Sequence, residues 1–417
     1  MLLIMLVTGW SHAWSATLEV PVGEGTLAKA LASASSGDTL RLLPGIYRGN
    51  VVIGTPAITL EGQPESIVQG EGSGSVILVE ADHVTLRGLT VQGSGIVESD
   101  LDAGIHLTKT ASQPVVEKNR IINNMFGIVV QGAAQALVQD NIIRNRNDLR
   151  MNERGNALQV WNTSGSRFLR NDVKGGRDGI YIHSAHGNTI IGNRFIDLRF
   201  AVHYMYANNN EVSDNLSMNN SVGLALMYSD NLKVFRNVSI NDREHGLMFH
   251  SSHRSEVAEN VVKKTQEKCT FIYLSTRNIL RNNHFEGCGI GIHFSGGAER
   301  NTIFGNAFIN NQNQVKYSGT VYYEWSQDKR GNYWSDNAAF DLNGDGVADT
   351  AYRPNNLVDR VIWSYPLAKL LLSSPVMETL RYAQNQFPAL YPGGVVDSWP
   401  LMAPPLAHRQ GPETSHP

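Results

Sequence analysis

The chain has 417 residues, with 35 Lys and Arg against 38 Asp and Glu, and a formal net charge of −3. A balance this even excludes a nucleic acid as the main partner, because phosphate binding requires a concentrated basic face. Charged residues make up only 18%, while glycine reaches 39 residues and asparagine is also frequent. This composition excludes a disordered chain, which needs more charge, and a helical bundle, which disfavours Gly and Asn. It is typical of a protein with many turns.

The first segment predicts export. Residues 1–7 are apolar and are followed by small residues around Ala13 and Ala16. The apolar run is too short to cross a bilayer, which takes about 20 residues, so we interpret residues 1–16 as a secretory signal peptide. A buried N-terminal strand is the alternative. No later segment of the sequence is apolar enough to span a membrane.

Between residues 38 and 320 the sequence repeats every 22 or 23 positions. Each unit is marked by an Asn, and the residue three positions before that Asn is always apolar. Asn141 and Asn171 are 30 positions apart, which indicates an eight-residue insertion between them. The marker residues are Asn119, Asn141, Asn171, Asn193, Asn215, Asn237, Asn260, Asn283 and Asn306.

Each unit has room only for short β-strands separated by Asn and Gly turns, so the units must stack to bury their apolar faces. Parallel stacking about 4.8 Å apart places equivalent residues directly above one another. An Asn can then adopt a left-handed corner and hydrogen-bond the same amide on the next coil. We predict an all-β, right-handed parallel β-helix of about a dozen coils over residues 17–320. A leucine-rich horseshoe is the rival, but its Leu spacing and helical segment are missing.

Both ends depart from the repeat. Residues 26–32 have a helical pattern that we expect to cap the N-terminal edge. Residues 321–417 form a C-terminal segment, in which Ser374 and Pro375 predict a helix start and the tail from Tyr391 is expected to be extended. This segment is either a cap for the solenoid or an arm that docks on a partner. The apolar residues at helical spacing are Val376, Leu380, Ala383 and Phe387.

His and Met residues gather at outward positions of four successive coils. The first and third residues after the Gly position of these strands are apolar and point inward, so the second and fourth point outward. Six of these eight outward positions are His or Met, although the chain holds only 13 His and 10 Met. His106 and His293 extend the stripe at its two ends. The six residues are His183, His203, Met205, Met227, Met248 and His250.

Stacking places four of the six residues in one column and His203 and Met248 in the column beside it. Imidazole and thioether ligands without carboxylates select a soft ion, for which Cu(I) fits better than Zn²⁺ or Ca²⁺. The stripe therefore predicts a copper site. The alternative is that these side chains pack beneath a loop or a partner protein. Four residues at the strand ends are candidate outer groups of the site: Tyr206, Tyr228, His186 and His253.

An acidic loop after the repeat predicts a structural Ca²⁺ site. Its oxygen-bearing residues follow the first nine positions of an EF-hand loop, with Gly346 at position six and Tyr352 in place of the Glu at position twelve. An acidic turn without a ligand is the alternative. The proposed ligands are Asp341, Asn343, Asp345, Val347 through its carbonyl, and Asp349.

The two cysteines, Cys269 and Cys288, are too few for a disulfide framework or a four-thiolate zinc site. They fall on neighbouring coils, about three residues out of register. Export permits a disulfide between them, although their register does not require one. Two unpaired thiols and a role in binding a soft metal are the other interpretations.

The sequence offers no catalytic arrangement. Polysaccharide hydrolases and lyases with this fold need a carboxylate pair or a Ca²⁺-assisted base on an outward face, and the outward positions above hold neither Asp nor Glu. Asp178 and Glu244 lie at strand starts on different coils, and we interpret them as turn carboxylates. A carbohydrate-active β-helix enzyme is nevertheless the main alternative to a metal-binding protein, and an adhesive surface solenoid is the third hypothesis.

Three C-terminal segments resemble the NosD family of periplasmic β-helix proteins: residues 331–336 (GNYWSD), the acidic loop 341–349, and residues 397–401 (DSWPL). The resemblance covers nearly the whole chain after the signal peptide. It implies a non-catalytic role in copper processing in the periplasm, together with an ABC transporter made of a permease and an ATPase. It also implies that copper comes from a membrane-anchored chaperone and goes to nitrous-oxide reductase, and that the C-terminal segment docks on the permease. The copper ligands named above rest on the strand register, not on this resemblance.

Overall fold

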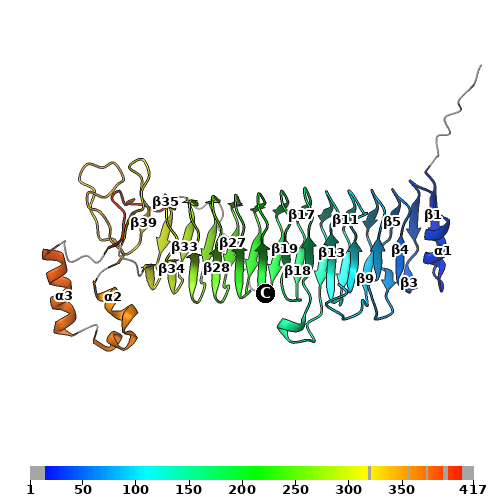
Figure 1. Cartoon of the computed structure of the whole chain (residues 1–417), viewed down its shortest axis with the longest axis horizontal. Helices are drawn as coiled ribbons and strands as arrows, with labels where there is room; N and C mark the ends of the chain where they lie inside the picture. Colours follow the sequence, from blue (N-terminus) through cyan, green and yellow to red (C-terminus); the bar gives the residue numbers. More distant parts are fainter. Residues whose placement is uncertain (1–14, 318–320, 356, 372–373, 388–392, 406–417) are drawn as a thin grey trace, which may run out of the picture.

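The computed structural model describes residues 15–317, 321–355, 357–371, 374–387 and 393–405. The predicted signal peptide lies almost wholly outside these ranges. The described chain forms a long rod with one helix at its N-terminal end and two at the other (Figure 1). The rod is a right-handed parallel β-helix whose three faces are parallel sheets of 13, 12 and 13 strands. This confirms the predicted fold and the number of coils.

The first face, sheet A, carries short strands whose central residue points into the rod. They are β1 (Thr17–Val20), β2 (Thr39–Leu42), β5 (Thr59–Glu61), β8 (Thr85–Arg87), β11 (Val115–Glu117), β14 (Leu137–Gln139), β17 (Arg167–Leu169), β20 (Thr189–Ile191), β23 (Glu211–Ser213), β26 (Lys233–Phe235), β29 (Glu256–Ala258), β32 (Ile279–Arg281) and β35 (Thr302–Phe304).

The second face, sheet B, follows sheet A around each coil. Its strands are β3 (Gly45–Arg48), β6 (Ser66–Gln69), β9 (Thr90–Gln92), β12 (Arg120–Ile122), β15 (Ile142–Arg144), β18 (Asp172–Lys174), β21 (Arg194–Ile196), β24 (Leu216–Met218), β27 (Val238–Ile240), β30 (Val261–Lys263), β33 (His284–Glu286), β36 (Ala307–Ile309) and β39 (Tyr333–Trp334).

The third face, sheet C, has the longer strands and carries the His/Met stripe. Its strands are β4 (Val51–Ile53), β7 (Ile77–Val79), β10 (Ala103–Leu107), β13 (Phe126–Gln131), β16 (Leu158–Trp161), β19 (Ile180–His183), β22 (Phe200–Met205), β25 (Val222–Met227), β28 (His245–His250), β31 (Lys268–Tyr273), β34 (Ile290–Phe294) and β37 (Asn313–Tyr317).

The inward residues of sheet C are those that alternation predicts. Both apolar positions of each central strand lie in the core of the rod, where burial of each large side chain contributes about 1.5–3 kcal/mol. A small residue stands near the start of each of these strands because the coils approach closely there: a Cβ on Gly223 would lie 2.4 Å from the carbonyl oxygen of Gly246. The buried inward residues are Ile180, Ile182, Val202, Tyr204, Leu224, Leu226, Leu247 and Phe249.

The repeated Asn residues form a continuous ladder inside the rod, as predicted. The Oδ1 atom of Asn215 accepts hydrogen bonds from the backbone N–H and the side chain of Asn193, at 2.9 and 3.0 Å. Its Nδ2 donates to the carbonyl of Ile190 and to Oδ1 of Asn237, both at 2.9 Å. The predicted left-handed corner is wrong by one position: it is the residue before the Asn, such as Asp214 with φ 58°, that adopts this conformation.

The N-terminal cap and the insertion both have their own short helix. Helix α1 (Thr26–Ser33) covers the first coil and buries Leu27 and Leu31 in the core, which confirms the predicted helical segment. The insertion leaves the rod between β15 and β16 as a loop that carries the 3-10 helix η1 (Met151–Glu153) (Figure 1).

The C-terminal segment covers the far end of the rod. Strand β38 (Tyr322–Glu324) pairs in parallel with β40 (Gly394–Val396). Next to β40, the buried carboxylate of Asp397 accepts hydrogen bonds from the backbone N–H of Asn332 at 2.7 Å and from the indole N–H of Trp334 at 2.8 Å. The first part of the tail, residues 393–405, therefore packs on the last coil. Residues 406–417 lie outside the described ranges.

Between β38 and β40 the chain forms α2 (Leu357–Ser364), the 3-10 helix η2 (Pro366–Leu371) and α3 (Pro375–Gln386). Ser374 caps α3, because its side chain accepts a hydrogen bond from the backbone N–H of Met377, and this confirms the predicted helix start. The predicted apolar face is only partly buried. Val376 and Phe387 are 67% and 63% exposed, whereas Met377 packs against α2.

Cys269 and Cys288 form a disulfide with their Cα atoms 5.6 Å apart. Both side chains are buried in the core of the rod. The sulfur atoms therefore join two coils from inside, and the alternative role as outward metal ligands is excluded. Among the described residues, no helix has both the length and the apolar character needed to cross a bilayer.

Candidate copper site

The six predicted copper ligands lie on four consecutive strands of sheet C: β19, β22, β25 and β28. The strand pairing brings them together in the register that the sequence predicts. The six residues belong to two neighbouring columns of paired residues, which we call column 1 and column 2. Column 1 holds the paired residues His183, Met205, Met227 and His250. Column 2 holds Tyr181, His203, Ala225 and Met248.

Burial sets two residues of column 2 apart from the rest of the two columns. His203 is only 7% exposed, and Ala225 beside it is fully buried although it points away from the core. The four residues of column 1 are half-buried, as are Tyr181 and Met248 in column 2. Column 1 therefore faces solvent, while His203 is enclosed by its neighbours.

A row of tyrosines borders column 1. Tyr206 and Tyr228 follow β22 and β25 and stack on each other with ring centroids 5.1 Å apart. Tyr206 also lies 5.8 Å from His183, and Tyr228 lies 5.0 Å from His250. These contacts place the two tyrosines beside the predicted ligands. Tyr273 extends the row, with its ring 5.1 Å from His250.

Asp178 is the residue that the sequence reasoning missed. It is fully buried and not a solvated turn carboxylate, so that interpretation is wrong. Its Oδ2 lies 3.0 Å from Nδ1 of His203, and both carboxylate oxygens accept hydrogen bonds from Arg199, at 2.7 and 2.6 Å. Burial by itself raises the pKa of Asp178, but the hydrogen bonds from His203 and Arg199 outweigh it and hold that pKa below its ordinary value.

The other ring nitrogen of His203, Nε2, is buried and has no hydrogen-bond partner among the described residues. A buried polar atom without a partner is unfavourable by about 1–3 kcal/mol. Among the described residues no three His, Cys, Asp or Glu side chains gather around one point, so a metal here must take thioether sulfur as well as imidazole nitrogen. The donor set on these strands therefore fits a soft ion such as Cu(I).

Three of the four remaining predicted His residues have other hydrogen-bond partners, whereas Nδ1 of the fourth, His293, is buried without one among the described residues. His186 accepts a hydrogen bond from the backbone N–H of Asn208 at 3.0 Å, and His253 bonds Thr276 in the same way at 3.1 Å. Both tie neighbouring coils together at the turns. His106 lies in column 2 several coils away, where it bonds Gln131 at 2.8 Å. At the other end of the column, burial and then Lys316 lower the pKa of His293 to about 4.

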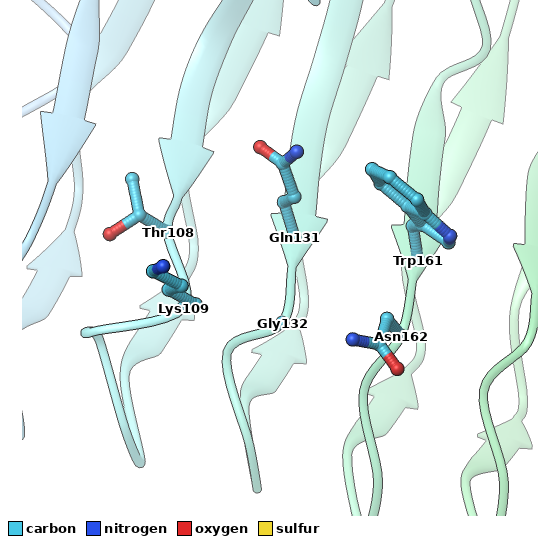
Figure 2. A pocket seen from close by; sticks show the side chains of 6 residues that line it. All are labelled: Thr108, Lys109, Gln131, Gly132, Trp161 and Asn162. Carbon is cyan, nitrogen blue, oxygen red and sulfur yellow. The ribbon is translucent and has the colours of Figure 1, made fainter.

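A surface pocket of about 360 Å³ lies at the N-terminal end of column 1. Figure 2 shows Gln131 and Trp161 on adjacent strands above Lys109 and Asn162. Trp161 is 44% exposed and pairs in register with His183. The pocket therefore continues the same outward face, with polar and aromatic side chains in place of His and Met.

The predicted calcium ligands lie in one loop, where no three acidic side chains of the described residues are placed to hold a metal ion. Asp341 accepts hydrogen bonds from the backbone N–H groups of Gly344 and Gly346, at 2.7 and 2.8 Å. Asp349 accepts from Leu342 at 2.7 Å. The carboxylates thus organise the loop backbone, and Ca²⁺ binding stays a prediction.

Comparison with known proteins agrees with the geometry. The family described as "Periplasmic copper-binding protein (NosD)" matches residues 139–339. The "Probable ABC transporter binding protein NosD" of Stutzerimonas stutzeri is 39% identical over 379 residues, which are 88% of this chain and 87% of that protein. The chain belongs to the NosD family. A NosD relative of the same description from Pseudomonas aeruginosa is 38% identical over 402 residues, covering 91% of this chain and 94% of that one.

A second family, described as "Right handed beta helix region", matches residues 58–173. Among solved structures, a family 28 exopolygalacturonase of Yersinia enterocolitica has a TM-score of 0.62 at 9% identity, over 73% of this chain and 77% of that one. A DFA-IIIase of Arthrobacter chlorophenolicus without its lid has a TM-score of 0.53 at 15% identity, over 74% and 100%. At this level of identity the two enzymes share the fold of the NosD chain and nothing more is implied.

Proposed function

We propose that this NosD protein carries Cu(I) in the periplasm on the His/Met stripe of sheet C. In this proposal it receives the ion from a membrane-anchored chaperone, works with an ABC transporter, and delivers the ion to nitrous-oxide reductase. The observation that carries the proposal is the register of β19, β22, β25 and β28, which stacks six His and Met side chains on one outward face. The family description and the names of the two relatives support the copper-related role and the link to a transporter.

The main alternative, a carbohydrate-active enzyme, finds less support in this geometry. Glycoside hydrolysis needs two carboxyl groups on opposite sides of the scissile bond. The outward positions of the four strands hold no carboxylate, and the nearby Asp178 is engaged with Arg199 and His203. An imidazole held by a buried carboxylate, with Met side chains on the same outward face, supports a soft-metal site instead.

The helical part of the C-terminal segment supports a docking role. Several large apolar side chains around η2 and α3 point to solvent, and contiguous apolar surface marks interaction sites. We propose that this surface contacts the permease. Replacing Leu367 and Leu370 by Asp should abolish transporter binding in detergent while leaving Cu(I) binding unchanged. The residues that are more than half exposed are Tyr365, Leu367, Leu370, Leu371, Val376, Tyr382 and Phe387.

The copper proposal is tested by anaerobic Cu(I) titration against a chromophoric competitor. The wild-type protein is compared with a variant that carries His183→Ala, Met205→Ala, Met227→Ala and His250→Ala. The matched control carries Met218→Ala and His284→Ala, which remove one Met and one His from sheet B. Binding that is lost in the first variant and kept in the control supports the proposal. Equal binding by all three proteins refutes this location.

A further inference from the structure

We propose that Cu(I) binds directly above Ala225, held by Nε2 of His203 and by the thioether sulfurs of Met227 and Met248, and that Asp178 is the positioning residue for His203. This inference rests on the proposed function and narrows it. It selects three of the six stripe residues as the principal ligands and adds a residue outside the stripe.

The first support is the hydrogen bond between Asp178 and His203. A carboxylate can only accept, so the 3.0 Å contact places the imidazole hydrogen on Nδ1. In the neutral ring the lone pair then belongs to Nε2, which is the atom that can bind a metal. Arg199 bonds both oxygens of Asp178 and so prevents the carboxylate from turning away. The arrangement matches the carboxylate–imidazole pairs that orient metal-binding histidines.

The second support is the burial of His203. Nε2 is a polar atom in a side chain that is only 9% exposed, and no group among the described residues bonds to it. The ring itself is fixed by Tyr181 and Phe200, whose centroids lie 4.8 and 5.0 Å away. The ring is therefore held from three sides, and a bound ion would satisfy its remaining nitrogen.

The third support is the small side chain of Ala225. Column 2 places it between His203 and Met248, which lie on strands two steps apart and therefore about 10 Å apart at the backbone. Met227 lies two residues further along the same strand and points to the same side. Larger side chains thus surround a single methyl group, and they cover it completely. The strand register therefore places the three side chains that carry the proposed nitrogen and sulfur donors around this methyl group.

Column 1 is less suited to the principal site. The Nδ1 atom of His183 lies 3.0 Å from the hydroxyl of Ser184, and the ring of His250 lies between those of Tyr228 and Tyr273. Neither ring has a carboxylate partner among the described residues. His183 and His250 flank the proposed site at a distance and are expected to affect its affinity weakly.

The proposal is tested by enlarging the side chain at position 225 while keeping every proposed ligand. Ala225→Leu should lower the Cu(I) affinity at least tenfold, whereas Ala225→Gly and His183→Ala should change it less than threefold. X-ray absorption of the wild-type copper protein should show two sulfur neighbours and one nitrogen. If Ala225→Leu binds like the wild type, copper lies elsewhere on the stripe and this inference is wrong, although the proposed function stands. If the wild type binds no Cu(I), the proposed function fails as well.

Asp178 is tested separately. Asp178→Asn should weaken Cu(I) binding by about 10- to 100-fold, with the fold checked by circular dichroism. Because a buried ion pair is removed, this variant can fail to fold. The tautomer is therefore also read in the wild-type apoprotein, by ¹⁵N NMR of labelled histidines with the His203 signal assigned through His203→Gln. A hydrogen on Nδ1 supports the positioning role, and a hydrogen on Nε2 overturns it whether or not copper binds.

Discussion

The side-chain amide of Asn306 donates a hydrogen bond to Oδ1 of Asn332 at 2.9 Å, although 26 residues separate them instead of 22 or 23. The backbone N–H of Asn306 bonds the same atom at 3.1 Å. The Asn ladder therefore continues one step beyond the region in which the sequence repeat is regular, and β39 is the strand that this step supports. The C-terminal segment begins as a further coil of the solenoid.

The ladder predicts a large and local loss of stability for Asn215→Ala. The substitution leaves two donors of Asn193 and the carbonyl of Ile190 without their partner inside the rod. We expect a loss of at least about 3 kcal/mol, because each of these three buried groups without a partner is unfavourable by about 1–3 kcal/mol. Thermal unfolding followed by circular dichroism measures the effect. Asn147→Ala, in the exposed insertion loop, is the control, and a similar midpoint for the two variants would contradict the ladder's role.

Asp242 occupies the interior position that Asn220 holds one coil earlier, and it predicts a pH-dependent stability. Burial raises the pKa of Asp242 to about 6. A pKa that is higher in the folded state favours the protonated form there. The stability from this group is therefore fully present below about pH 4 and is lost as the pH rises through about 6.

Asp242→Asn removes this dependence, since the amide keeps an acceptor for the backbone N–H of Asn220. At pH 7.5 the variant should be more stable by about 3 kcal/mol, and the difference should vanish near pH 4. Thermal midpoints across this range test it, with Asp197→Asn as an exposed control. A gain that is equal at both pH values would argue against titration of Asp242.

The position of the disulfide predicts that its removal lowers the stability of the protein without changing its Cu(I) affinity. Replacing both Cys269 and Cys288 by Ala removes a cross-link that closes a short loop, which stabilises by about 3 kcal/mol in the chain-entropy description. The thermal midpoint should therefore fall. Because both sulfurs face the core, Cu(I) affinity in the same competition titration should not change. A parallel loss of affinity would show that the last coils contribute to the site.

The acidic loop predicts weak calcium binding. Without a Glu at position twelve, we expect a dissociation constant of about 10⁻⁴–10⁻³ M, at the weak end of such loops. Calorimetric titration with CaCl₂ should detect binding that Asp345→Ala abolishes and Asp328→Ala leaves intact. Heat of binding that is absent from the wild type at millimolar Ca²⁺ would identify the loop as an acidic turn without a ligand.

Much of the rod follows from sequence periodicity, because each rung depends on neighbours one repeat away. The Asn spacing predicts the stacking, and the alternation in each strand predicts which residues of columns 1 and 2 point outward. The burial of Asp178 could not be predicted in this way, because its partners Arg199 and His203 come from the next coil and not from the strand that follows Asp178. One signal was present: Arg199 follows Asp178 by 21 residues, which is close to one repeat and places opposite charges on adjacent coils.

The packing of the C-terminal segment could not be predicted from the sequence for a different reason. Its contacts join residues far apart in the chain, such as Asp397 and Trp334. These contacts follow no sequence repeat from which they could be predicted. The spacing of α3 predicts a helix but not which face packs, since Val376 and Phe387 turn to solvent while Met377 is buried. Which face of a helix is buried depends on the elements that pack against it, and these are known only from the three-dimensional structure.

The stacking of sheet C also determines how far the strands of the His/Met stripe lie from the C-terminal helices. Strand β28 is three steps and β22 five steps from the last strand of the sheet, β37, which is about 15–25 Å along the rod. In the proposed function, a transporter bound to the helices would therefore lie several coils away from the proposed copper site. Every coil between them is hydrogen-bonded to the next by three sheets and by the Asn ladder, so the rod is stiff. A rotation of the helices would then move the proposed site as part of one rigid body.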